Sequence, residues 1–374
     1  MKQKQRVMHV TLSLDIGGLE TVIKELSRRL DPTRFSSEVL CLCGYDEDNI
    51  RGLKEDGVPV HLLRKRHKFD LGYFWRVAKL LRRQKIDILH AHSGCFFYAS
   101  LFARLAGVRR FIYTAHGLPV LNRLQDRIED NLAGLACSAI VPVSEEIKTV
   151  LEQRMPLSKG KMVPILNGID TDRFRPFADE AERQQVLTKY NLPEDAFLVG
   201  SVGRLDPVKN YPMLLRAFAR LVCKSASNAH LVMVGEGPCR AALEQLAAEL
   251  GIADQVTFLG RQYRVFEILP LLDAFVLSSI TEGTSVALLE AQACGVPAVV
   301  TDVGGNGNII REGVNGFLCE VNADACMMAG LQRLREGRQL QQKMASEARE
   351  AVLQRFGLPA MVQNYEILFL QGPA

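Results

Sequence analysis

Short apolar runs typical of β-strands alternate with helical patterns along this chain, and the alternation stops and begins again near the middle. Strands and helices that follow one another in this way favour parallel sheets whose faces are covered by helices. The chain has 374 residues, which is more than one hydrophobic core usually organises. We therefore expect an α/β protein with two domains, each built on its own parallel sheet.

The two series of strands can be placed by residue number. Each strand is a short apolar run bounded by Gly, Pro or polar residues. We expect strands at 7–14, 37–42, 86–90, 110–114 and 139–143, and then at 197–202, 230–234, 256–258, 271–277 and 298–301. Between the two series, residues 173–196 are polar and contain prolines, so this stretch reads as a linker with a short helix. The predicted domains are 1–172 and 173–357, followed by a terminal segment, 358–374, that contains one more helix.

The composition is that of a globular protein. Apolar residues make up 48% of the chain, charged residues make up 24%, and no apolar run approaches the roughly 18 residues of a membrane span. The nine cysteines contain no CxxC pair, which favours reduced thiols over disulfides or a zinc site. The first residues lead directly into a strand without a signal-peptide pattern. We therefore expect a cytoplasmic location.

Basic residues are concentrated in the first half of the chain. Residues 1–172 contain 27 Lys and Arg against 20 Asp and Glu, whereas the remainder contains 19 against 22. The densest basic segment is 64–85, where a helix with an apolar stripe at 74, 77, 78 and 81 would turn Trp75 outward among Arg and Lys side chains. This face is either simply solvated or a peripheral anchor at the anionic inner face of a membrane. The basic half also suits an acidic or lipid-phosphate acceptor.

The segment 278–310, SSITEGTSVALLEAQACGVPAVVTDVGGNGNII, places two glutamates around the start of a predicted helix at 284–293. Glu282 and Gly283 lie in the preceding loop, where free backbone N–H groups and the helix dipole favour an anion such as phosphate. Glu290 lies about 9 Å along the helix at 1.5 Å per residue. Its two carboxylate oxygens suit the paired hydroxyls of a ribose. Together these features predict a site for a nucleoside diphosphate.

Further motifs occur in a fixed order along the chain. They are GGLE at Gly17, DILHAHS at Asp87, TAHG at Thr114, PVSEE at Pro142, NGID at Asn167, VGRLDPVKN at Val202, VGEGP at Val234, FLG at Phe258 and EGVNGFL at Glu312. With the segment above, they resemble the retaining glycosyltransferase family 4, and the resemblance covers nearly the whole chain. It implies the GT-B architecture, in which two Rossmann-like domains face each other across a cleft and the last helix crosses back onto the first domain.

The resemblance also implies an activity. A sugar would pass, with retention of its configuration, from a UDP- or GDP-sugar to a glycan or lipid-linked acceptor in polysaccharide or glycolipid biosynthesis. In the account favoured for the family, the acceptor attacks from the front face and the departing diphosphate oxygen takes its proton. We expect no cofactor, no metal ion and no nucleic-acid partner. The DxD pairs Asp170–Asp172 and Asp46–Asp48 lie in a loop motif and a polar loop, and we do not interpret them as metal ligands.

Residues that match the family's motifs are expected to form the site. The expected catalytic residues are His116, Glu282, Arg204 and Lys209, and His92 is expected on the acceptor side. The expected donor-binding residues are Gly17, Gly18, Gly203, Arg204, Lys209, Gly235, Glu236, Arg261, Glu282, Gly283, Thr284, Ser285, Val286 and Glu290.

Several of these residue types suit their roles. Arg204 offers a planar fork and Lys209 a point charge, which together match a diphosphate that gains charge as its bond to the sugar breaks. A surface ion pair between Arg204 and Asp206 is the alternative. His116 ends a strand and so points into the crevice where open α/β sheets bind ligands, although a buried structural histidine is the default interpretation. Because side chains alternate along a strand, we expect only one of His90 and His92 to face the crevice, and we favour His92.

One position departs from the family's pattern. Family members commonly carry a glutamate after the two glycines, in GGxxEII, whereas this sequence has GGNGNII with Asn308 there. Asparagine keeps a hydrogen-bond acceptor but loses the charge. Asn308 is the sole support for one alternative to a transferase, a partner protein that binds the nucleotide without turnover. The other alternative is a nucleotide-sugar epimerase, which shares the architecture that the resemblance implies.

Overall fold

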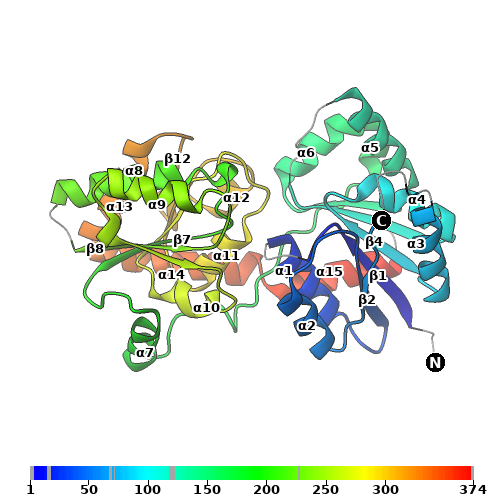
Figure 1. The fold of residues 1–374 in the computed structure, drawn as a ribbon, viewed down its shortest axis with the longest axis horizontal. Helices are drawn as coiled ribbons and strands as arrows, with labels where there is room; N and C mark the ends of the chain where they lie inside the picture. The colour runs from blue at the N-terminus through cyan, green and yellow to red at the C-terminus, as the bar shows by residue number, and fades with distance from the viewer. Residues whose placement is uncertain are drawn as a thin grey trace. The chain divides into compact units, whose positions relative to one another are not determined.

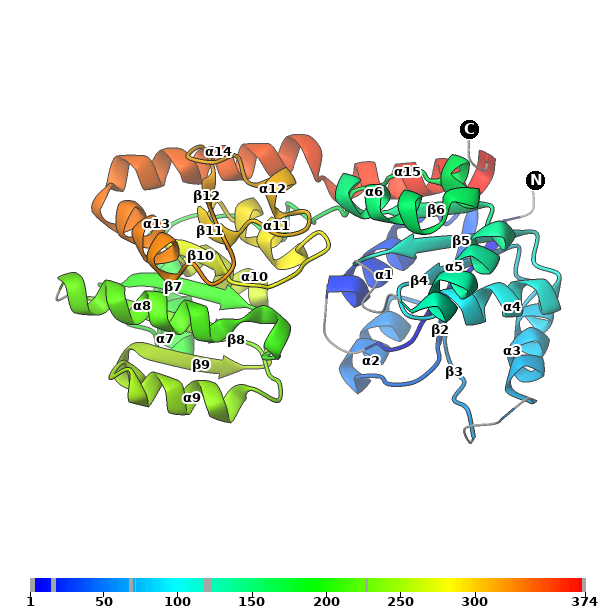
Figure 2. The same ribbon diagram turned by 90° about the horizontal axis from the view of Figure 1, so that it is seen from above.

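The computed structural model describes residues 4–14, 18–66, 70, 72–117, 123–225 and 228–371. The chain divides into two compact units, one formed by residues up to Gly168 and from Pro359 onward, and the other by Ile169–Leu358. Over the described residues, each unit holds a six-stranded parallel sheet flanked by helices (Figures 1 and 2). The predicted pair of α/β domains is confirmed. The division after Gly168 lies a few residues before the boundary that the sequence predicts.

The sheet of the first unit has the strand order β3-β2-β1-β4-β5-β6. The order reverses between β1 and β4, and ligands of open parallel sheets bind at the carboxyl edge of such a reversal. Its strands are β1 (Gln5–Thr11), β2 (Phe35–Cys41), β3 (Val60–Leu62), β4 (Ile88–His92), β5 (Arg110–Ala115) and β6 (Ala139–Pro142).

The two faces of this sheet are covered by different helices. Met8 and Leu89 point to one face, where they join a core with α3, α4, α5 and α6. The alternate residues His9 and His90 point to the other face, toward the rings of Tyr365 and Phe369 in α15. The helices of the unit are α1 (Gly18–Arg29), α2 (Glu47–Glu55), α3 (Gly72–Arg83), α4 (Phe96–Ala106), α5 (Leu124–Ala136), α6 (Glu145–Arg154) and α15 (Leu358–Gln371).

The predicted outward position of Trp75 in α3 is confirmed, since 61% of its surface is exposed. The buried stripe differs slightly from the prediction, because Tyr73 is buried with Val77 and Leu81 while Phe74 is only partly covered. Arg76 does not simply project into solvent. Its guanidinium binds the Asp70 carboxylate at 2.6 and 3.1 Å.

The second unit repeats the same topology, with the order β12-β11-β10-β7-β8-β9 and a reversal between β7 and β10. Its strands are β7 (Phe197–Val202), β8 (Ala229–Val234), β9 (Val256–Gly260), β10 (Ala274–Leu277), β11 (Ala298–Thr301) and β12 (Gly316–Cys319). Its helices are α7 (Glu180–Tyr190), α8 (Tyr211–Ser225), α9 (Arg240–Glu249), α10 (Val265–Ile268), α11 (Val286–Ala293), α12 (Asn306–Ile309), α13 (Asp324–Glu336) and α14 (Arg338–Arg355).

The short helix predicted in the linker is α7, and it packs on the second unit. The side chain of Asp179 caps its first turn by accepting the Glu182 N–H at 2.9 Å. Lys189 and Tyr190, at its other end, both bind the Glu267 carboxylate, at 2.6 and 2.9 Å. No helix among the described residues is long and apolar enough to cross a membrane.

Candidate functional site

The loops that follow β7 and β10 meet at the sheet reversal of the second unit. Ser278 Oγ donates a hydrogen bond to the Lys209 carbonyl at 2.8 Å, and the Ile280 N–H donates to the Val208 carbonyl at 2.8 Å. These bonds fix the two loops side by side. As a result Lys209 Nζ lies 2.6 Å from Glu282 Oε1. The fold thus joins two residues that the sequence predicts for the same site but separates by 73 positions.

The carboxylate of Glu282 is held from two sides. Its Oε1 atom accepts the ammonium of Lys209 and also the hydroxyl of Ser279, at 2.5 Å. The Lys209 and Glu282 side chains are only 20% and 11% exposed, so their attraction is screened less than that of a surface pair. Ser279, which is fully buried, is not among the residues that the sequence predicts for the site. The one feature of the sequence that could have indicated Ser279 is its position, as a small polar residue between a predicted strand and Glu282.

Glycines bring neighbouring loops into contact with this pair. Gly304 has a positive φ of 58°, and a Cβ there would lie 2.0 Å from the Glu282 carbonyl oxygen. Gly305, the next residue, donates its N–H to the Gly283 carbonyl at 2.7 Å. The two glycines after β11 therefore allow the loop that carries Glu282 to pack directly on their backbone.

A second close approach joins the loops after β7 and β8. Gly235 has a φ of 144°, and a Cβ there would lie 1.9 Å from the Gly203 carbonyl oxygen. The Leu205 N–H donates to the Glu236 carbonyl at 3.0 Å. The carboxylate of Glu236 pairs with Arg240 at 3.0 Å. The predicted residues Gly203, Gly235 and Glu236 therefore lie together beside the loop of Arg204.

The arginines predicted for this site lie at its surface. The Arg204 side chain is 70% exposed, and its Nε atom is 3.9 Å from Asp206 Oδ2. The alternative interpretation, an ion pair with Asp206, is thus present, but an exposed pair at this distance contributes little. Arg261 directly follows β9 and is also exposed.

Helix α11 begins next to Glu282. Ser285 is its N-cap, since its hydroxyl accepts the Leu288 N–H at 3.3 Å. The helix therefore starts two residues later than the sequence predicts, because Thr284 and Ser285 lie outside it. Thr284, Ser285 and Val286 are buried. Further along, Glu290 is also buried, and its charge adds to the burial that raises the pKa of the Cys294 thiol.

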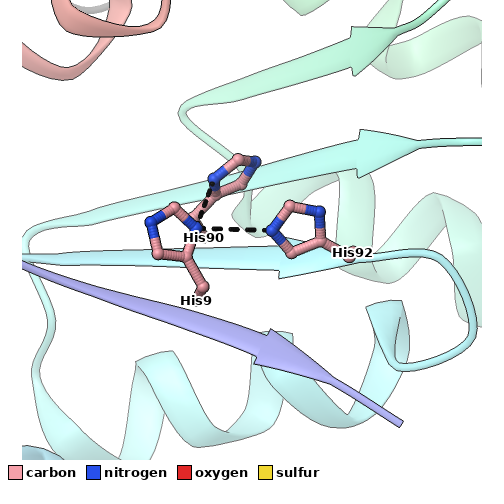
Figure 3. Close-up of side chains that lie close together, drawn as sticks. All are labelled: His9, His90 and His92. Atoms are coloured by element: carbon pink, nitrogen blue, oxygen red, sulfur yellow. Dashed lines mark hydrogen bonds between the residues drawn. The ribbon is translucent and has the colours of Figure 1, made fainter. Parts of the chain in front are cut away.

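In the first unit, the expectation that His90 and His92 point to opposite faces of their strand is wrong. Side chains of a strand repeat every two residues, so positions 90 and 92 share a face. Their ring centroids are 4.2 Å apart, and both side chains are fully buried with His9 of β1 (Figure 3). His92, which we expected on the acceptor side, is therefore enclosed in the structure.

His116 is bonded to this group of histidines. His92 Nδ1 lies 2.9 Å from His116 Nε2, and His92 Nε2 lies 3.4 Å from His9 Nδ1. Burial lowers the pKa of His9 and of His116 from 6.5 to about 3, because an imidazolium would lose its hydration. It also lowers the pKa values of His90 and His92, with the neighbouring histidines adding to the effect. All four imidazoles are therefore neutral at pH 7.

Among the described residues, one group of side chains could reach a common metal ion. The nearest ring nitrogens of His9, His90 and His92 lie within 4.8 Å of one another. The closest approach is 3.1 Å, between His90 Nδ1 and His9 Nδ1, which is a hydrogen-bond distance (Figure 3). Hydrogen bonds between neutral rings thus account for the cluster. Asp170, of the first DxD pair, accepts the N–H groups of Asp172 and Arg173 at 3.2 Å and so stabilises a turn.

The other predicted positions are distributed as follows. Gly17 lies outside the described residues, whereas Gly18 is the first residue of α1. Asn308, which replaces the family's glutamate, is exposed on α12. Its backbone N–H donates to the Gly305 carbonyl at 3.1 Å. The position thus lies three residues after Gly305 and is bonded to its backbone.

The first unit has a cavity of its own near the ends of β1 and β2. Its volume is about 520 Å³. Lys65 contributes a cation that lies 4.4 Å from the ring centroid of Tyr98. The lining residues are Leu12, Leu42, Cys43, Gly44, Arg64, Lys65, Tyr73 and Tyr98. Basic and aromatic side chains therefore line this cavity together with apolar ones.

Two family models match the chain. Residues 16–173 match the model described as "Glycosyltransferase Family 4", and residues 182–351 match "Glycosyl transferases group 1". The putative glycosyltransferase EpsD of Bacillus subtilis is 30% identical over 77% of this chain and 78% of its own length. The UDP-Gal:alpha-D-GlcNAc-diphosphoundecaprenol alpha-1,3-galactosyltransferase of Escherichia coli is 25% identical over 98% of this chain and 97% of its own.

The fold is also that of known glycosyltransferase structures. The crystal structure of Anabaena Alr3699/HepE in complex with UDP and glucose superposes with a TM-score of 0.86 at 20% identity, and covers 98% of this chain and all of the other. These comparisons do not favour an epimerase or a partner without turnover. The chain belongs to glycosyltransferase family 4 and has the GT-B architecture of two α/β domains.

Proposed function

We propose that this glycosyltransferase takes a sugar from a nucleoside diphosphate sugar and transfers it, with retention and without a metal ion, to a glycan or lipid-linked acceptor. The Lys209–Glu282 pair at the sheet reversal of the second unit is the observation that supports this most directly. It offers a cation and a carboxylate beside the start of α11, where a diphosphate would meet the N-terminal end of a helix. The galactosyltransferase of E. coli is named for a UDP-sugar donor, and HepE structures hold UDP and UDP-glucose.

Donor binding would exchange the partner of Lys209. In the structure its ammonium neutralises one carboxylate, that of Glu282. A diphosphate carries more negative charge than a carboxylate and therefore competes for this ammonium. Arg204, which is exposed and only loosely paired, supplies a second cation. Glu282 then keeps its bond from Ser279, and its carboxylate becomes available to the hydroxyls of the transferred sugar.

The bond changes follow from this arrangement. The acceptor oxygen forms a bond to the anomeric carbon on the face from which the diphosphate departs. The carbon–oxygen bond to the diphosphate breaks, and the acceptor's proton passes to the departing oxygen. Lys209 and Arg204 stabilise the charge that grows on that oxygen. Glu282 binds rather than attacks, because its carboxylate still accepts the Ser279 hydroxyl and is engaged by the hydroxyls of the sugar.

Other residues hold the remaining parts of the donor. We assign the ribose hydroxyls to Glu290 and the diphosphate oxygens to the backbone N–H groups of 283–286. Gly235, Glu236 and Arg261, at the ends of β8 and β9, would surround the base. His116 of the first unit would contact the sugar.

The acceptor would bind to the first unit. We place it at the cavity of about 520 Å³ rather than at His92, which is fully buried. Arg64 and Lys65 suit a phosphate or carboxylate of the acceptor, and Tyr98 offers an aromatic face to a sugar ring. The E. coli relative is named for a diphosphoundecaprenol acceptor, which supports a role in polysaccharide or glycolipid biosynthesis.

A lipid-linked acceptor would require the protein to reach a membrane surface. Trp75 on α3 is exposed, and Lys79 and Arg83 are exposed on the same helix. We propose peripheral binding through this basic helix. Sedimentation with vesicles that contain phosphatidylglycerol should show binding, and Trp75→Ala with Arg83→Ala should reduce it. Equal sedimentation of the variant would contradict this role for α3.

The reaction can be tested with a panel of UDP- and GDP-sugars. Release of the nucleoside diphosphate should occur with one of them and should persist in EDTA, and proton NMR of the product should show a retained anomeric configuration. Lys209→Ala should lower turnover about a hundredfold, as loss of one charge-stabilising group does in other enzymes. Lys189→Ala, which breaks the 2.6 Å pair with Glu267 in the same unit, is the matched control. An inverted product, or equal losses in the two variants, would contradict the proposal.

A further inference from the structure

A continuous series of hydrogen bonds crosses the covered face of the first sheet. It begins at Tyr365 of α15, whose hydroxyl lies 3.0 Å from Thr114 Oγ1. Thr114 Oγ1 lies 2.7 Å from His90 Nε2, and His90 Nδ1 lies 3.1 Å from His9 Nδ1. From His9 the series continues through His92 to His116, over 3.4 and 2.9 Å. Figure 3 shows His9 Nδ1 as the atom at which the two branches meet.

The protonation of the rings along this series is correlated. A neutral imidazole carries one proton, so one of its nitrogens donates and the other accepts. If His9 Nδ1 carries the proton, His92 must accept at Nε2 and donate from Nδ1. His116 must then accept at Nε2 and carry its own proton at Nδ1. If His9 Nδ1 is bare, every step reverses and His116 Nδ1 is bare as well.

We propose that His9 and His92 are positioning residues that set the tautomer of His116, so that the Nδ1 atoms of His9 and His116 are both protonated or both bare. His116 Nδ1 is buried and has no hydrogen-bond partner among the described residues. An unpartnered buried nitrogen of this kind is ready to bind a ligand group. The histidine series thus determines whether this atom donates or accepts. The link to catalysis rests on the proposed function, in which His116 contacts the donor sugar.

The branch from His9 to His90, Thr114 and Tyr365 allows His9 Nδ1 of the natural protein to be either protonated or bare. The Thr114 hydroxyl can donate to His90 Nε2 or accept from it, since a hydroxyl does both. Replacement of Thr114 by Val removes this choice. A buried N–H without a partner is rarer than a buried acceptor without one. With His9 Nδ1 protonated, the variant would bury two such N–H groups, at His90 Nε2 and His116 Nδ1, whereas the reverse state buries only one, at His9 Nε2. His90 would therefore leave Nε2 bare and protonate Nδ1. His9 Nδ1 must then accept, and His116 is fixed with a bare Nδ1.

Long-range proton–nitrogen NMR of ¹⁵N-histidine-labelled protein tests this without any substrate. The chain has seven histidines, and single substitutions assign their signals. We expect the same protonation at Nδ1 of His9 and His116, and the opposite protonation at Nε2 of His92. Opposite states at His9 and His116 would overturn the proposal. So would a pattern that changes on addition of EDTA, because a metal ion would then join the rings.

Two variants distinguish an effect of the His116 tautomer from an effect of altered packing around the histidines. Thr114→Val should fix His116 as the tautomer protonated at Nε2, whereas Tyr365→Phe removes a hydroxyl from the same contact, leaves Thr114 intact and should keep the natural pattern. If the natural protein carries the proton at His116 Nδ1, loss of this donor should lower kcat roughly 2- to 10-fold in Thr114→Val only; if Nδ1 is already bare, kcat should be the same in both variants. Binding of the free nucleoside diphosphate, which lacks the sugar, should not change. A tautomer that differs from the natural one with unchanged kcat would refute the positioning role, as would a changed kcat with an unchanged tautomer, whereas no turnover in any protein would count against the proposed function alone.

Discussion

Acidification from pH 7 to pH 5 should destabilise the first unit, because its buried histidines are neutral. In the folded protein the pKa values of His9 and His116 are about 3, whereas in the unfolded chain they return to 6.5. Between these values the unfolded chain binds more protons than the folded one. The stabilisation is therefore complete above pH 6.5 and is lost progressively as the pH falls.

The size of the effect follows from the pKa difference. One pKa unit corresponds to about 1.4 kcal/mol. At pH 5, which is about 1.5 units below the unfolded value, His9 and His116 should each reduce the free energy of unfolding by about 2 kcal/mol. Their sum of about 4 kcal/mol is a large part of the 5–15 kcal/mol that is typical of a domain. The lowered pKa values of His90 and His92 act in the same direction.

Urea unfolding at pH 7, 6 and 5 would measure this loss. Trp75, the only tryptophan of the chain, lies in α3, so its fluorescence anisotropy reports on the first unit. His9→Gln should reduce the difference between pH 7 and pH 5 by about 2 kcal/mol. His230→Gln in the second unit should leave the Trp75 transition unchanged. Equal free energies of unfolding at pH 7 and pH 5 in the natural protein would refute the reasoning.

Three substitutions in the second unit test its site. Gly235→Ala should destabilise the unit by about 2–3 kcal/mol, since its Cβ would meet the Gly203 carbonyl at a positive φ; an unchanged thermal midpoint would contradict this. Ser285→Ala should cost about 1 kcal/mol in urea unfolding, because the Leu288 N–H loses its cap. Glu290→Gln should weaken UDP or GDP binding about tenfold. In the Glu290→Gln variant, a 2′-deoxy nucleotide should bind as tightly as the ribonucleotide, because the contact with the ribose is already lost. If removal of the 2′-hydroxyl weakens binding by the same factor in the variant and in the natural protein, Glu290 does not contact the ribose.

The alternation of strands and helices predicted the fold because each buried strand is a short apolar run bounded by turn residues. The two strands that the sequence analysis missed, β3 and β12, are both edge strands, of three and four residues. Edge strands are commonly short, and β3 is only partly buried, so neither forms a recognisable apolar run. Tertiary pairing with β2 and β11 therefore decides their structure.

The site was predictable in its residue types but not in its pairings. Family motifs indicated Lys209 and Glu282 separately, yet their 2.6 Å contact depends on two loops that β7 and β10 bring together. Similarly, DILHAHS and TAHG did not reveal that His9 joins their histidines, because the pairing of β1 with β4 is a long-range contact. The error about His90 and His92 was different in kind. The two-residue period of a strand was sufficient to place them on one face.

Calorimetric binding of UDP, GDP, ADP and NAD, with and without EDTA, tests the central claim most directly. We predict that one nucleoside diphosphate binds selectively, that EDTA does not alter its affinity, and that Lys209→Ala weakens it while Lys189→Ala does not. Binding of none of the diphosphates, a preference for NAD, or binding that EDTA abolishes would contradict a metal-independent nucleotide-sugar site at Lys209 and Glu282.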